Sequence, residues 1–196
     1  MLGRHAESIA AARRAVEVDP LALFSHGNLI MAQYLASRFE DGIVTCEKVL
    51  ELSPQNSEAY RWSALCHFHL GRRDEALVAI QKAVDYSGRH FWPLANQAAM
   101  LARVGKREEA IAILEDLKDR EAHTYVPPIA VASVHASLGD LDSFFASMER
   151  AVEVRDFWLP MLRVDPGFTA MQKHPRFAAM LDKFAPAIPT ATVSVN

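Results

Sequence analysis

A small residue recurs every 34 residues along most of this chain. Gly3, Ser37, Gly71, Gly105 and Gly139 follow one another at this interval without any change of phase. Self-similarity at a fixed period of this length is the signature of a solenoid made from helix–turn–helix units. We therefore expect stacked helical layers with a core that runs between neighbouring layers, and not a domain built around a single centre.

The residues that follow each small residue have a helical pattern. Positions five, nine and twelve residues later are mostly small or apolar, and this spacing places them on one helix face. The first of these positions holds Ser8, Gly42, Ala76, Ala110 and Phe144. Small residues there allow two helices to approach closely. We expect the larger Phe144 either to push the last two helices apart or to bury its ring against the C-terminal segment.

The residues before each small residue are also expected to be helical. These first helices are predicted at Leu23–Ala36, Ser57–Leu70, Phe91–Val104 and Val126–Leu138. The second helices open with acidic residues, which suits the positive end of the helix dipole.

This layout resembles the tetratricopeptide repeat family. The match is clearest in Ser37–Pro54 and in Ser57–Ala83, where the matching residues are Tyr60, Ala64, Gly71, Ala76 and Ala83. The resemblance implies an all-α, right-handed α-α superhelix over residues 1–155. Its expected units are a half repeat at 1–20 and repeats at about 21–54, 55–88, 89–122 and 123–156.

The period stops after Arg155, where aromatic residues and prolines become dense. We predict a short helical C-terminal cap over residues 156–185 that covers the end of the solenoid, followed by a disordered tail at 186–196. This region is similar to the closing segment of repeat regions in bacterial multidomain signalling proteins. The matching residues are Tyr125, Pro127, Pro128, Leu138, Gly139, Asp140, Arg155, Asp156, Trp158, Leu159, Val164, Asp165, Pro166, Phe168, Pro175, Arg176 and Phe177.

Composition and charge disfavour several classes of protein. The net charge is −3 and basic residues are interspersed with acidic ones, so a nucleic-acid partner is not expected. No apolar run approaches the roughly 18 residues that a membrane helix needs. Cys46 and Cys66 lie on apolar stretches of predicted helices, and we expect two free, buried thiols in a reducing, cytoplasmic compartment.

Catalytic and metal-binding patterns are not found in the sequence. His67 and His69 are two residues apart on a predicted helix and point in different directions, so they cannot chelate one metal ion together. The chain lacks a nucleophile elbow, a phosphate-binding loop and a dinucleotide-binding turn. We therefore expect a non-enzymatic protein with no cofactor and no metal site.

The concave face of the first helices is the expected binding surface. In the family that the chain resembles, this face binds extended peptides or a helix of a protein partner. Tyr, Trp and Arg, which often dominate binding energy, are well represented on it. The candidate partner-binding residues are Phe24, Asn28, Met31, Tyr34, Arg61, Trp62, Phe68, His69, Trp92, Asn96 and Arg103.

Each of these residues could also be ordinary packing between helices. An alternative function is a regulatory or sensor region of a longer bacterial signalling protein, such as a transcription regulator, cyclase or kinase. Such a region would act by self-association or intramolecular contact. The frame begins with a second helix that lacks its first, and this truncated N-terminal end is a candidate homodimer interface.

Overall fold

The computed structural model describes residues 4–184, and within these residues the chain is built from helices and loops without strands. The predicted tail at 186–196 lies outside the described residues. The long helices are α1 (His5–Val18), α2 (Leu23–Leu35), α3 (Phe39–Leu52), α4 (Ser57–His69), α5 (Arg73–Tyr86), α6 (Phe91–Arg103), α7 (Arg107–Glu121), α8 (Pro128–Leu138) and α9 (Leu141–Glu153).

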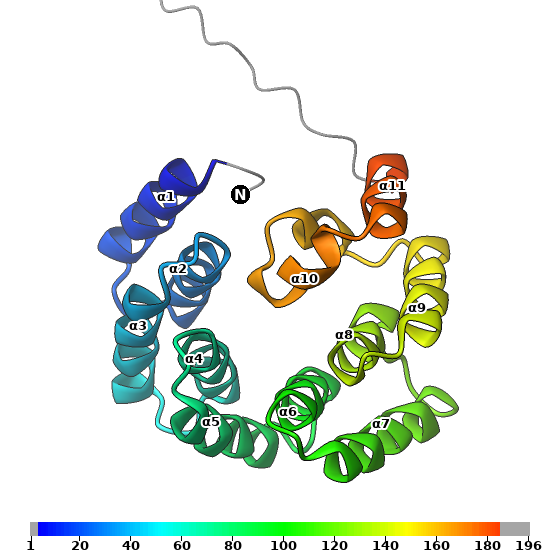
Figure 1. Cartoon of the computed structure of the whole chain (residues 1–196). Helices are drawn as coiled ribbons and strands as arrows, with labels where there is room; N and C mark the ends of the chain where they lie inside the picture. Colours follow the sequence, from blue (N-terminus) through cyan, green and yellow to red (C-terminus); the bar gives the residue numbers. More distant parts are fainter. Residues whose placement is uncertain (1–3, 185–196) are drawn as a thin grey trace, which may run out of the picture.

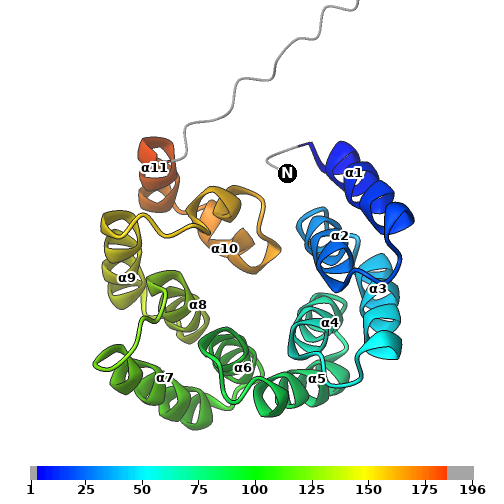
Figure 2. The same ribbon diagram turned by 180° about the vertical axis from the view of Figure 1, so that it is seen from behind.

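These helices stack side by side into a curved, nearly closed arc (Figures 1 and 2). Helices α2, α4, α6 and α8 form the inner, concave side, while α3, α5, α7 and α9 lie outside them. The expected all-α solenoid is therefore confirmed.

The 34-residue period has a conformational origin at the end of each inner helix. Ser37 has a φ of 56° and Gly71 a φ of 78°, and Gly105 and Gly139 are also left-handed. Beyond Gly71, the amide of Arg72 donates to the His67 carbonyl at 3.0 Å, which closes the helix end. Glycine adopts this backbone without steric cost, so the repeating turn accounts for the repeating small residue.

A second reason for small residues is the close approach of neighbouring helices. A Cβ atom added to Gly42 on α3 would lie 2.9 Å from the Sγ atom of Cys66 on α4. Cys46 and Cys66 are both free and buried, as the sequence predicts. Burial raises the pKa of the Cys66 thiol to about 12, so this thiol is un-ionised at neutral pH.

The C-terminal segment covers the last outer helix and also turns into the arc. It comprises the 3₁₀ helices η1 (Leu159–Arg163) and η2 (Pro166–Phe168), followed by α10 (Thr169–Gln172) and α11 (Pro175–Phe184). Phe144 is fully buried, with its ring centroid 5.7 Å from that of Phe177 and 6.5 Å from that of Phe168. Of the two outcomes expected for Phe144, the structure shows burial against the C-terminal segment.

Candidate functional site

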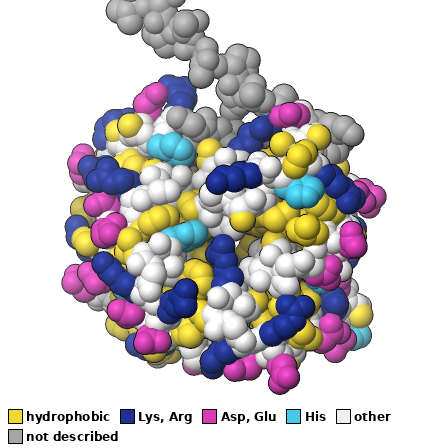
Figure 3. All heavy atoms as spheres, in the orientation of Figure 1, with side chains coloured by type: hydrophobic (Ala, Val, Ile, Leu, Met, Phe, Trp, Pro, Cys, Tyr) yellow, Lys and Arg dark blue, Asp and Glu magenta, His cyan; other side chains and the backbone are white. Residues whose placement is uncertain are grey.

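The concave side of the arc encloses a cavity of about 550 Å³. The inner helices α2, α4, α6 and α8 form one part of its wall, and the C-terminal segment forms another. Figure 3 shows that this face of the molecule is hollowed near its centre, with hydrophobic and basic side chains around the hollow. All eleven side chains that the sequence predicts for the concave face line this cavity.

Helix register explains how these side chains come together. Phe24 and Trp92 lie in the first turns of α2 and α6, whereas His69 and Arg103 lie in the last turns of α4 and α6. Because each inner helix is separated from the next by one antiparallel outer helix, the inner helices run in the same direction. Residues at the same position of successive repeats therefore lie at the same level of the cavity.

The exposure of the predicted residues varies widely. Phe24 is 81% exposed, whereas Trp62 is only 6% exposed and Tyr34 only 2% exposed. Trp62 and Tyr34 belong to the core cluster between the first repeats, and their ring centroids are 5.1 Å apart. Tyr34 and Trp62 therefore have a packing role in addition to any role in binding.

Asn28, Met31, Phe68 and Asn96 are partly buried at the surface of the cavity. Asn28 and Asn96 occupy the same position in repeats that are two apart. Among the described residues, Asn28 has no side-chain hydrogen bond, and the amide nitrogen of Asn96 has none either. The exposed Arg103 places its guanidinium carbon 5.6 Å from the centroid of the Phe68 ring.

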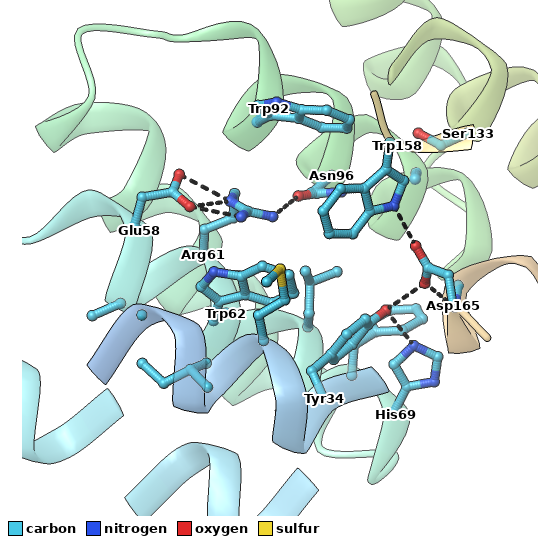
Figure 4. A pocket seen from close by; sticks show the side chains of 18 of the residues that line it. Tyr34, Glu58, Arg61, Trp62, His69, Trp92, Asn96, Ser133, Trp158 and Asp165 are labelled. Carbon is cyan, nitrogen blue, oxygen red and sulfur yellow. Dashed lines mark hydrogen bonds and ion pairs between the residues drawn. The ribbon is translucent and has the colours of Figure 1, made fainter. Parts of the chain in front are cut away.

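Arg61 brings a positive charge into the cavity. Its Nη2 atom donates to Glu58 at 2.6 Å, and its Nη1 atom makes a longer contact of 3.4 Å with Oδ1 of Asn96. The guanidinium carbon lies 4.2 Å from the centroid of the Trp62 ring. Figure 4 shows Trp92 on the other side of Arg61. Partial burial opposes ionisation of Glu58, but the charge and hydrogen bonds of Arg61 prevail and lower the pKa of Glu58.

Trp158 and Asp165 of the C-terminal segment complete the wall. Trp158 packs between Trp62 and Trp92, with ring centroids 6.4 and 6.2 Å apart, respectively. Its Nε1 atom donates to Oδ2 of Asp165 at 2.9 Å, and the hydroxyl of Tyr34 donates to Oδ1 at 3.2 Å (Figure 4). These contacts fasten the C-terminal segment to α2 and α4.

Burial shifts the pKa values of both Asp165 and His69. Burial raises the pKa of Asp165, although hydrogen bonds from Trp158, Gly167 and Tyr34 act in the opposite direction. His69 lies 3.2 Å from the Tyr34 hydroxyl, and burial together with the charge of Arg103 lowers its pKa to about 4. His69 is therefore neutral at physiological pH and contributes hydrogen bonding but no charge.

The sequence did not lead us to expect that the C-terminal segment enters the concave side. A cap over the end of the solenoid accounts for α11, but not for Phe157, Trp158, Asp165 and Phe168, which line the cavity. The physical reason is that the irregular chain from Asp156 turns inward, where Asp156 accepts a hydrogen bond from the Trp158 amide at 3.0 Å. The sequence feature that could have indicated this inward turn is the high density of aromatic residues after Arg155.

Residues 4–184 contain no group of three His, Cys, Asp or Glu side chains that could hold a metal ion. Over the same residues, no helix combines the length and the apolar character required to cross a bilayer.

Comparisons with known proteins agree with the fold. Residues 22–117 match the family described as anaphase-promoting complex, cyclosome, subunit 3. The structure is similar to the crystal structure of MamA, with a TM-score of 0.52 and 18% sequence identity, over 79% of this chain and 91% of that chain. No curated protein matches the sequence. The family match and the structural likeness together confirm the repeat type that the sequence resembles.

Proposed function

We propose that this tetratricopeptide-repeat protein binds a short, extended segment of a protein partner in its concave cavity. Repeat proteins of this type are typically non-catalytic scaffolds, and their fold suggests protein–protein interaction in general. The observation that carries the proposal is the cavity of about 550 Å³, where apolar and aromatic walls surround polar groups without protein partners. Recognition sites commonly combine such walls with a few convergent polar groups.

The side-chain amides of Asn28 and Asn96 favour an extended segment. A carboxamide has both a donor and an acceptor, so Asn28 and Asn96 can each pair with the N–H and C=O groups of a peptide backbone. The two amides lie in equivalent positions two repeats apart, which suits a chain that runs along the cavity. Aromatic walls then receive the side chains of the segment.

The same cavity argues against a bound helix, which the sequence left as an option. An α-helix with its side chains is about 10–12 Å across, so a volume of about 550 Å³ would hold little more than one turn. The C-terminal segment forms part of the cavity wall and limits the width that is available to a ligand beside the inner helices. That segment is anchored by buried residues such as Leu162 and Phe168.

The test combines partner capture with fluorescence. All three tryptophans of the chain, Trp62, Trp92 and Trp158, line the cavity, so the intrinsic tryptophan emission reports on this site. Proteins that co-purify with the wild-type chain from its native cells would be identified, and segments of them synthesised. Their titration should change the tryptophan emission of the wild type.

The double variant Asn28→Ala and Asn96→Ala should weaken binding at least tenfold, since it removes hydrogen bonds to the ligand while leaving the core intact. A matched control is the double variant Lys48→Ala and Gln55→Ala, in exposed residues outside the cavity. Equal affinity of the cavity variant and the wild type would refute the proposal.

A second candidate is self-association through α1. No residue of α1 is buried, and Val18 at its end is 87% exposed, with Leu21 beside it 73% exposed. Light scattering coupled to size exclusion tests this directly. A monomer mass at high protein concentration would refute self-association, while a dimer that Val18→Glu dissociates would support it.

A further inference from the structure

Arg61 and Glu58 form an asymmetric ion pair at the cavity. The Arg61 side chain is 10% exposed, while the Glu58 side chain is 55% exposed. The guanidinium therefore lies inside the cavity wall, and its carboxylate partner extends from the first turn of α4 toward solvent. Charged groups that are held away from water require hydrogen-bonding partners of opposite charge.

The hydrogen bonds of Arg61 are incomplete. The Nε atom donates to Glu58 at 3.0 Å and Nη2 donates at 2.6 Å, whereas Nη1 has only the 3.4 Å contact with Asn96. A guanidinium has five N–H donors, and these contacts engage about three of them. The remaining N–H donors of Arg61, which lines the cavity, can donate to an acceptor atom of a ligand.

Both carboxylates that line the cavity already have hydrogen-bonding partners, so neither is available to a positively charged ligand. Glu58 is paired with Arg61, and Asp165 accepts from Trp158, Tyr34 and the Gly167 amide. Arg103 also lines the cavity and forms no ion pair with the described residues. Its uncompensated charge, together with the free donors of Arg61, makes the cavity complementary to a negative group.

The walls beside Arg61 are flat and aromatic. Trp62 lies under the guanidinium at 4.2 Å, and Trp158 packs between the rings of Trp62 and Trp92 (Figure 4). A ligand that reaches Arg61 must therefore place an apolar surface against indole rings. An aromatic side chain suits this position, because rings pack favourably in tilted and offset arrangements.

We propose that Glu58 is an internal substitute for a ligand carboxylate, and that the partner segment presents an Asp or Glu next to an aromatic residue to Arg61. On binding, the ligand carboxylate replaces Glu58 in the ion pair with the Arg61 guanidinium, and the Glu58 side chain turns out into solvent. This inference rests on the function proposed above and adds the chemistry of the partner segment.

The experiment uses pairs of synthetic peptides and the chain of 196 residues. Each blocked heptapeptide of a small library contains an aromatic residue next to Glu, and its twin carries Gln in place of Glu. Binding is followed through the tryptophan emission of the wild type. We expect the acidic member of the binding pairs to have at least tenfold higher affinity than its twin, since hydrogen bonds between charged groups are the stronger ones.

Two variants test the role of the ion pair. Glu58→Gln should increase the affinity for the acidic peptide about threefold to tenfold without changing that for the Gln twin, because a competing carboxylate is removed. Arg61→Gln should abolish the preference for the acidic twin. The matched control is Glu115→Gln, which removes the acidic partner of the exposed pair Lys118–Glu115 on α7 and should change neither affinity.

The outcomes separate this inference from the proposed function. Equal binding of both twins, or an unchanged affinity in Glu58→Gln, would overturn the inference and leave peptide binding in place. The absence of any peptide binding, with a change of emission on adding 4-phenylbutyrate, would overturn both and indicate a site for small carboxylic acids. If Arg61→Gln does not fold, as judged by circular dichroism, the predicted gain in Glu58→Gln still decides the question.

Discussion

Replacing Phe144 by alanine gives the sharpest test of how the C-terminal segment is held. The corresponding position of the other units holds a small residue, namely Ser8, Gly42, Ala76 or Ala110. Phe144→Ala therefore gives the last unit the same kind of residue as the others. Substitutions toward a repeat consensus commonly stabilise a protein. Here we expect the opposite, because the Phe144 side chain is fully buried.

The magnitude follows from what the ring contacts. Its centroid lies 5.0 Å from the ring of Phe145, 5.7 Å from that of Phe177 and 6.5 Å from that of Phe168. Truncation of a fully buried phenylalanine to alanine costs about 3–5 kcal/mol, from lost burial and from the cavity that remains. At about 2–4 °C per kcal/mol for a chain of this size, the melting temperature should fall by about 6–20 °C.

The assay is urea and thermal unfolding followed by circular dichroism and by tryptophan emission. Loosening of the segment should also shift the emission of Trp158 to longer wavelength before the helices unfold. Phe24→Ala is the matched control, since Phe24 is exposed and its loss should change the free energy of unfolding by less than about 0.5 kcal/mol. If Phe144→Ala is as stable as the wild type, the aromatic cluster does not anchor the C-terminal segment, and our reasoning is wrong.

Three further predictions concern the helix contacts, the thiols and a buried carboxylate. Gly42→Ala should lower the free energy of unfolding by about 1–3 kcal/mol, because the new Cβ meets the Cys66 sulfur; urea unfolding that matches the wild type would contradict this. Cys46 and Cys66 should react with a thiol reagent at pH 8 only slowly in the native protein and rapidly in urea, since both are buried with raised pKa values. Fast native labelling would rule this out. Because the pKa of Asp165 is raised in the folded state, its ionisation opposes folding. The free energy of unfolding of the wild type should therefore rise relative to Asp165→Asn as the pH falls from neutral through the raised pKa toward the usual value of about 4. Urea midpoints at several pH values measure this difference, and a difference that is independent of pH would count against it.

The sequence predicted the repeat and the concave residues because both follow from short-range regularities. A left-handed turn at Gly71 recurs at Gly105 and Gly139, and each inner helix presents the same positions to the concave side. One alignment of the repeats therefore located side chains such as Asn28 and Asn96 on a common surface.

The C-terminal contribution to the site could not be read in the same way. Trp158 and Asp165 lie in a segment with no repeat, so no periodicity assigns them to a face. Their contacts join residues that are far apart in the chain, such as Tyr34 and Asp165 with a separation of 131 positions. Such contacts depend on the curvature of the whole arc, which a local pattern does not specify.

The long-range contact between Tyr34 and Asp165 has a consequence for how the protein is made. Helix α2 leaves the ribosome well before Asp165 is synthesised, and neighbouring repeats can stack as they emerge, since each layer contacts mainly its neighbours. Trp158 and Asp165 arrive late and supply the remaining wall. A nascent or prematurely terminated chain that stops before Asp156 would therefore contain most of the helices and lack an enclosed binding cavity. Competence for the proposed binding would therefore be acquired only after Trp158 and Asp165 have been synthesised and have packed against the inner helices.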